Sequence, residues 1–190
     1  RRSTGYLLAV TALMGSFVTY LSGLESVIDQ SYDLASRFPL IFGALATVMG
    51  VMMVSNRHLV GRFGAVSVAR TAFLALVTVT IGGSVLVAAT GGRPPLAAFL
   101  VLMAAILACQ AILLPNLTSM ALEPMGAIAG VASSVIGAIQ TAGGAILGGI
   151  VLATFDGTTR PMVFGFALFA VIGTGFALWA ERGPAALAPT

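Results

Sequence analysis

The sequence predicts an all-α membrane protein that crosses the bilayer with six helices. Composition is the first observation behind this prediction: of 190 residues, 58% are hydrophobic and 8% are charged, and the mean hydropathy is +1.06. A soluble domain carries about 25% charged residues, because its surface faces water. The few charges of this chain suffice only for loops and helix ends, so the sides of the molecule are expected to face lipid.

Six long apolar stretches are the second observation. About 20 apolar residues in a helix cross a bilayer core. Helices are expected rather than barrel strands, because lipid offers no partner for free backbone groups and the stretches do not alternate. The expected spans are Tyr6–Ser26, Phe38–Ser55, Ser67–Ala89, Leu96–Leu122, Ala127–Ala153 and Pro161–Ala180. Charged or turn residues separate them, at 25–37, 56–64, 91–95, 123–126 and 156–160.

The distribution of arginine predicts the orientation, because cytoplasmic segments are enriched in basic residues. With the N-terminus inside, six of the nine arginines fall on inner segments and three on outer segments. Both termini are therefore predicted to be cytoplasmic. The segment 56–64, which holds Arg57 and Arg62, is predicted to be a cytoplasmic basic loop.

An internal repeat is the third observation. A shift of 94 positions places residues 41–50 on residues 135–144, with Gly, Ala, Thr and Gly in register, and carries the first span onto the fourth and the third onto the sixth. A unit of three helices crosses the membrane an odd number of times, so its copy must be inverted. We expect one domain over 1–190 with a 3+3 inverted-topology repeat, units about 4–93 and 97–186, as in secondary transporters. Chance agreement between abundant Gly and Ala is the alternative.

Small residues predict close helix contacts in the second and fifth spans. Gly at intervals of four allows the backbone of another helix to approach closely. The contact would lie either inside the bundle or between two moving halves of a transporter. The residues concerned are Gly43, Gly50, Gly126, Gly130, Gly137, Gly144 and Gly148.

Five residues of the first and fourth spans are candidates for a substrate cavity. Gln110 and Asn116 are costly in lipid and should face either a neighbouring helix or a substrate path. Phe17, Tyr20 and Leu24 share one helix face, which would form either an apolar ligand surface or part of the core.

No ionisable group is expected at mid-depth. Glu25 lies about 34 Å along the first helix from Arg2, which places it at the outer edge of the membrane. His58 falls in the basic segment, and the single cysteine, Cys109, can form neither an internal disulfide nor a metal site. A competing interpretation is an intramembrane serine protease, which needs Ser and His in contact within the membrane; the position of His58 in the basic segment argues against it. We expect no catalytic residue, metal or cofactor.

The fourth and fifth spans also carry a resemblance to a known family. The chain resembles the drug:proton antiporters of the bicyclomycin and chloramphenicol resistance type, in the major facilitator superfamily. The residues that carry the resemblance are Leu114-Pro115-Asn116, Ala121-Leu122-Glu123-Pro124, Ala129-Gly130-Val131-Ala132-Ser133-Ser134 continuing to Gln140, Tyr32-Asp33-Leu34 and Arg62-Phe63-Gly64.

The resemblance implies helices seven to twelve of an exporter whose N-terminal six-helix half is missing from this chain. The first and fourth spans would line a central cavity, and the fifth would contact the other half. It further implies proton-coupled efflux of small amphipathic compounds from the inner membrane of a bacterial cell, with the N-terminal half, the substrate and protons as partners. Glu25 stands where the family has an uncharged residue, and the basic segment lacks the family's Asp and paired Arg. The alternative is a non-transporting membrane module, retained as an assembly partner.

Overall fold

The chain folds into six long helices in a computed structural model that describes residues 2–182, with only the backbone given for Ala127. All six are long and apolar enough to cross a membrane, and no strand occurs in these residues. The fold therefore confirms the predicted class, a multi-pass helical membrane protein. The helices are α1 (Arg2–Tyr32), α2 (Phe38–Phe63), α3 (Ala65–Ala89), α4 (Leu96–Leu122), α5 (Ala129–Ala153) and α6 (Arg160–Glu181), with short 3-10 turns at Ala35–Arg37 and Glu123–Ile128.

Two helices run further than the hydropathy pattern indicates. α1 continues to Tyr32 rather than ending at Ser26, and α2 continues to Phe63 rather than ending at Ser55. Helix geometry does not require lipid, and neither extension contains a proline to interrupt it. The predicted basic loop is consequently wrong: Arg57 and Arg62 lie on the last turns of α2, and Gly64, with φ of 79°, is the whole connection to α3.

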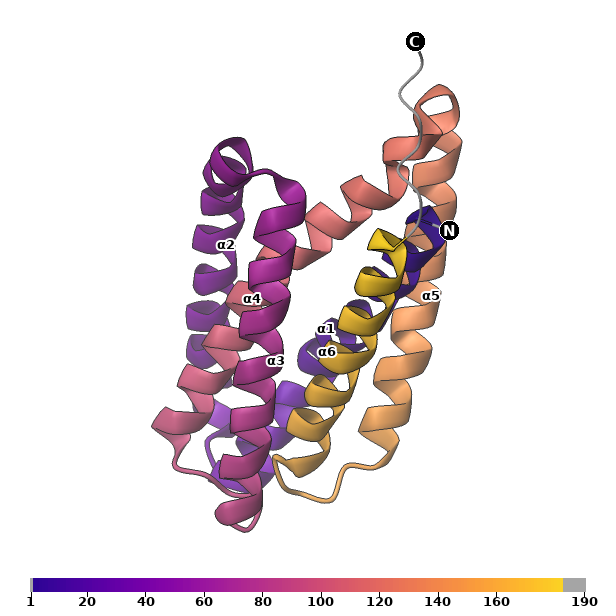
Figure 1. The fold of residues 1–190 in the computed structure, drawn as a ribbon. Coiled ribbons are helices and arrows are strands. Elements are labelled where there is room, and N and C mark those ends of the chain that lie inside the picture. The colour runs from indigo at the N-terminus through magenta and orange to yellow at the C-terminus, as the bar shows by residue number, and fades with distance from the viewer. Residues whose placement is uncertain (1, 183–190) are drawn as a thin grey trace.

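The two helix triplets are interleaved. α1 packs mainly against α5 and α6, whereas α4 packs mainly against α2 and α3. α1 also contacts α4, and α3 contacts α6, so exchanging the first triplet for the second reproduces the pattern of contacts. Figure 1 shows α4 crossing the bundle obliquely, from beside α2 and α3 at one end towards α5 at the other. This is the pairing that a 3+3 inverted repeat requires.

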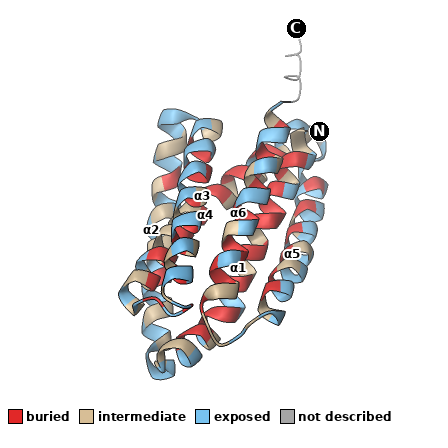
Figure 2. Ribbon diagram, turned by 60° about the horizontal axis from the view of Figure 1, so that its bottom comes forward, coloured by how far each residue is buried: buried red, intermediate tan, exposed pale blue. Residues whose placement is uncertain are grey.

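Burial follows the same symmetry. The most completely buried side chains come largely from α1 and α4, which form the centre of the bundle. By contrast, α2 buries only Leu45 and Asn56. α5 is also largely open, as its exposed ribbon shows in Figure 2. The equivalent helices of the two triplets, α2 and α5, are therefore the least covered.

Glycine brings α1 and α5 into close contact. A Cβ added at Gly148 would lie 2.9 Å from Val18 Cγ1, and one added at Gly144 would overlap Met14. From the other side, a Cβ at Gly15 would lie 2.8 Å from Leu147 Cβ. These glycines act inside the bundle, which is one of the two roles expected of them.

The other predicted glycines have a different environment. A Cβ added at any of them would meet no atom within 4 Å. They lie on α2, on α5 and on the turn between α4 and α5, and they take no part in packing within this bundle. They are Gly43, Gly50, Gly126, Gly130 and Gly137.

Polar contacts join the helix ends at both edges of the bundle. At the edge where α1 begins and α6 ends, Arg2 pairs with Glu123 at 3.1 Å and Arg70 pairs with Glu181 at 2.6 Å. At the opposite edge the turns are held by hydrogen bonds to backbone carbonyls. Tyr32 Oη donates to Pro94 O (2.9 Å), Ser31 Oγ to Gly157 O (3.1 Å), and Thr159 Oγ1 to Gly92 O (2.9 Å). The first two contacts join the end of α1 to the α3–α4 and α5–α6 loops, and the third joins these two loops to each other.

The close approach of α1 and α5 predicts a large effect of bulk at Gly148. Gly148→Leu should destabilise the helical domain by about 1–3 kcal/mol, because the new side chain must displace Val18 and the backbone of α1. Gly149→Leu is the matched control, since the neighbouring position meets nothing within 4 Å. Thermal unfolding in detergent measures both variants. Equal effects would contradict the packing described here.

Candidate functional site

Aromatic rings from α1 and α2 form a cluster that sequence analysis identified only in part. Tyr20 stacks on Phe17 of its own helix, with centroids 6.2 Å apart, and on Phe42 of α2 at 5.7 Å and 6°. Phe42 also contacts Phe38, at 5.6 Å. Tyr20 is buried, whereas the three phenylalanines are half-buried. The cluster is a rigid, mainly apolar wall that still presents surface outside the bundle.

Leu24 does not belong to this wall. Its side chain is completely buried in the hydrophobic core. The predicted stripe of Phe17, Tyr20 and Leu24 is therefore divided: Phe17 is half-buried, whereas Leu24 lies fully in the core. Phe38 and Phe42 complete the cluster instead, and no pattern within α1 alone could have identified them.

Two buried polar atoms have no hydrogen-bond partner in the described part of the chain, and both belong to predicted cavity residues. They are Tyr20 Oη and Gln110 Oε1, on residues that are 2% and 1% exposed. Leaving such a group unpaired in an apolar interior costs about 1–3 kcal/mol, so each case requires an explanation.

The two unpaired groups lie at similar depth. α1 and α4 run in opposite directions, and the hydrogen bond from Tyr32 to Pro94 brings the end of α1 beside the start of α4. From that shared edge, Tyr20 lies about 18 Å along α1 and Gln110 about 21 Å along α4, at 1.5 Å per residue. Both distances are near the middle of the helices, so the bundle holds unsatisfied polar groups in its interior.

Asn116 has a different role from Gln110. Asn116 Nδ2 donates to Asn56 Oδ1 at 3.0 Å, and Asn56 Nδ2 donates to Asn116 Oδ1 at 3.2 Å. This reciprocal pair is buried and joins α4 to α2. The Asn116 amide is thus engaged with a neighbouring helix, and the structure places it in helix packing rather than on a cavity wall.

The polar pair adjoins the proline of α4. Pro115 has no N–H, so the carbonyl of Ala111 loses its usual helical partner. Two residues beyond Asn116, Thr118 Oγ1 accepts a hydrogen bond from Gln140 Nε2 of α5 at 3.1 Å. The end of α4 that follows the proline is therefore joined to α2 on one side and to α5 on the other.

Acidic groups lie near the helix ends. Glu25 is exposed on α1, close to the level at which α5 ends, because a Cβ at the neighbouring Gly23 would meet Leu152 at 2.6 Å. In the loop after α5, Thr158 donates to Asp156 Oδ1 and lowers the pKa of that carboxyl. Within residues 2–182, no three His, Cys, Asp or Glu side chains come together as a metal-binding group.

Six interleaved helices that are long and apolar enough to cross a membrane, with two unpaired polar atoms buried among them, define a class, the multi-pass helical membrane bundle. The chain is 28% identical over 185 residues to the uncharacterized MFS-type transporter YdgK of Bacillus subtilis (strain 168). The match covers 96% of this chain and 45% of that protein, so the chain spans less than half the length of its relative. No family model and no solved structure matches the chain. The similarity supports membership of the major facilitator superfamily.

The reciprocal asparagine pair predicts a strong coupling between α2 and α4. Asn56→Ala and Asn116→Ala should each destabilise the bundle, because each leaves a buried amide without its partner. The double variant should lower the free energy of unfolding by less than the sum of the two single variants, and the difference, the coupling energy, should be about 0.6–2 kcal/mol. Unfolding in mixed detergent micelles gives the three free energies. Additive effects would show that the pair does not stabilise the bundle.

Proposed function

We propose that this chain is the C-terminal half of a secondary transporter that exports small amphipathic compounds by proton-coupled alternating access. The observation that carries the proposal is the match of nearly the whole chain to less than half of an MFS-type transporter. The interleaved triplets agree with it, because inverted repeats of three helices build each half of such transporters. Repeat units close to residues 4–93 and 97–186 fit this division.

The uncovered faces of α2 and α5 support a second six-helix half as partner. Both helices carry glycines whose surroundings are empty, among them Gly43, Gly50 and Gly137. Small residues at a helix surface let another helix approach closely in lipid, where there is no hydrophobic gain from association. A partner half would cover these two faces and leave α1, which contacts both helices, between them.

In a cavity between the halves, the aromatic cluster and the unpaired groups of Tyr20 and Gln110 would bind substrate. Ligand sites of this kind are mainly apolar, with a few polar groups that orient the ligand. Phe17, Phe38 and Phe42 supply apolar surface, and the tyrosine hydroxyl and glutamine carbonyl supply one donor and one acceptor. Rearrangement during the transport cycle would expose these two groups to substrate.

Proton coupling requires an ionisable group within the membrane. The six acids of this chain all lie near helix ends or in loops. In the proposed transporter the coupling acid is therefore on the other half. The arginine distribution supports cytoplasmic termini in a bacterial inner membrane.

The transport proposal is tested with both halves present. The chain should be produced with the N-terminal half of YdgK, or with the segment encoded before Arg1 if that segment is present, and reconstituted in liposomes. We expect accumulation of a lipophilic cation such as ethidium that depends on a pH gradient and is abolished by a protonophore. The chain alone is the control and should transport nothing. An assembled pair that transports no compound of a broad amphipathic panel would favour the non-transporting module instead.

The role of Gln110 is tested by comparing two glutamines. Gln110→Leu removes an acceptor that has no partner, so stability should be unchanged or higher, while transport should fall about tenfold if the group contacts substrate. Gln140→Leu is the matched control, because it breaks the hydrogen bond to Thr118 and should lower stability instead. Thermal unfolding and initial transport rates separate the two effects. Unchanged transport in Gln110→Leu would remove Gln110 from the site.

A further inference from the structure

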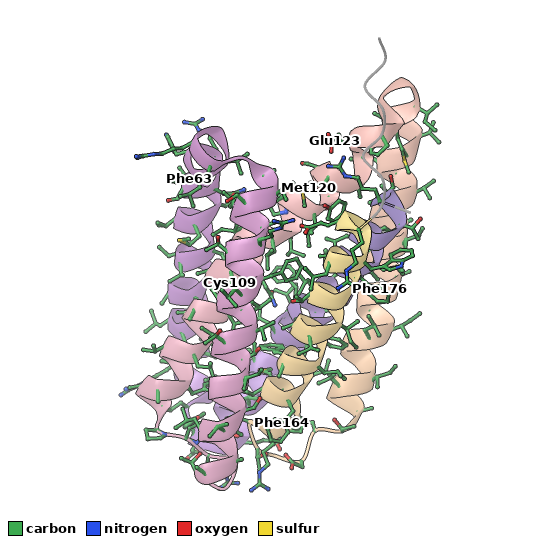
Figure 3. All side chains as sticks on the ribbon, in the orientation of Figure 1. Phe63, Cys109, Met120, Glu123, Phe164 and Phe176 are labelled. Atoms are coloured by element: carbon green, nitrogen blue, oxygen red, sulfur yellow. The ribbon has the colours of Figure 1, made fainter. Side chains whose placement is uncertain are left out.

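An apolar groove lies outside the aromatic cluster, between α2, α3 and α4. It has a volume of about 490 Å³. Met52, Leu59 and Phe63 of α2 form one wall, Ala72 and Ala75 lie on the α3 wall, and Cys109 lies on its floor in α4. Figure 3 shows Phe63 near the α2–α3 turn and Cys109 deeper in the bundle. From Phe63 to Met52 the groove follows α2 for about 16 Å, or half the thickness of a bilayer core.

The groove exists because α2 and α3 pack on α4 more than on each other. Both helices have α4 as a main neighbour, and they make few contacts with one another although only Gly64 separates them. The side chains between them are small, as at Ala72, Ala75 and Ala108, and do not fill the space. In a membrane such a groove is occupied by hydrocarbon rather than by water, because its lining offers few polar partners.

A positive charge lies at the mouth of the groove. The guanidinium carbon of Arg62 is 5.3 Å from the centroid of the Phe63 ring, and Phe63 lines the groove. The two ion pairs formed by residues 2–182 are Arg2 with Glu123 and Arg70 with Glu181, so both carboxylates at this edge are engaged elsewhere. Arg62 therefore holds its charge beside apolar surface without a carboxylate partner.

The start of α3 adds further donors at the same mouth. α3 begins at Ala65 with no side-chain cap and no acidic residue in its first turn, so its first N–H groups have no side-chain acceptor. The hydroxyl of Ser67, on this first turn, lines the groove. An anion held at this point would meet a guanidinium, backbone N–H groups and a hydroxyl, and all of these can donate to phosphate oxygens.

We propose that the groove binds an anionic phospholipid, with its phosphate on Arg62 and the first turn of α3 and one acyl chain along the groove towards Cys109. Bulk lipid tails would fill the groove without preference for a headgroup. The charged mouth gives a preference for an anionic headgroup, because arginine near a bilayer attracts anionic lipids and binds phosphate through two parallel hydrogen bonds. The site lies in the leaflet next to the α2–α3 turn and does not depend on the transport proposal.

The rate of alkylation of the single cysteine measures how far the groove is occupied by lipid. Cys109 is the only thiol of the chain and is partly exposed in the groove. The whole chain should be reconstituted in vesicles of phosphatidylcholine, or of equal parts phosphatidylcholine and phosphatidylglycerol, and treated with N-ethylmaleimide. We expect alkylation about fivefold slower with phosphatidylglycerol, the factor that one basic residue gives at a membrane surface. Equal rates in the two vesicles would overturn the proposal without any variant.

Two variants locate the headgroup. Arg62→Gln should remove the difference between the vesicles, because the phosphate loses its main partner. Arg57→Gln is the matched control: it removes the same charge from α2 but lies five residues away, about 140° around the helix from Arg62, and should keep the difference. Equal loss in both variants would show general attraction to the surface rather than a site. Thermal unfolding of each variant confirms that the bundle is intact.

Crosslinking distinguishes the phospholipid from a free anion. Phosphatidylglycerol with a photoreactive group in its acyl chain should label peptides of α3 and α4 that line the groove, and Arg62→Gln should reduce the labelling about fivefold. Inorganic phosphate in excess should not compete strongly, because it gains nothing from the apolar groove. Labelling that is distributed evenly over the lipid-facing helices would contradict a specific site.

Discussion

The inability of hydrocarbon to form hydrogen bonds is the constraint on which this structure depends. Every backbone group within the membrane must be satisfied by the chain itself, which leaves long helices as the spanning element. The same constraint acts on side chains. Asn56 and Asn116 satisfy each other across two helices, and Gln140 bonds Thr118 across another pair. Against this background, the unpaired Tyr20 hydroxyl and Gln110 carbonyl are exceptions among the described residues.

Packing in this bundle combines close contacts inside with open surfaces outside. α1 approaches α5 through Gly144 and Gly148, where backbone and side chains fit without space for a Cβ. On α2, Gly43 and Gly50 meet nothing within 4 Å, although Gly50 falls on Gly144 when the chain is shifted by 94 positions. Lipid entropy and van der Waals contact drive helix association in membranes, so small residues are informative only together with what lies opposite them.

The interleaved arrangement gives α1 and α4 a double role. They contact each other at the centre of the fold and also carry the buried groups of the candidate cavity. A movement that exposes Tyr20 or Gln110 must therefore also shift the contacts of these helices with their neighbours. The ion pairs at one edge and the carbonyl hydrogen bonds at the other join the helix ends of both triplets, which suits motion of the bundle as a unit.

The sequence by itself indicated the lipid solvent and the helical element type, and it predicted a repeat, because hydropathy and a shift of 94 positions depend only on the order of residues. It also identified Gln110 and Asn116 of α4 as costly in lipid, but it left open what each side chain contacts. Only the tertiary structure decided that Asn116 pairs with Asn56, that Leu24 lies in the core, and that Phe42 completes the stack on Tyr20. Those outcomes depend on the crossing and rotation of helices distant in the chain, which the periodicity of a single helix does not encode. The structure also showed that Arg57 and Arg62 are helical. Charged residues end the apolar stretch of α2, but they do not end the helix.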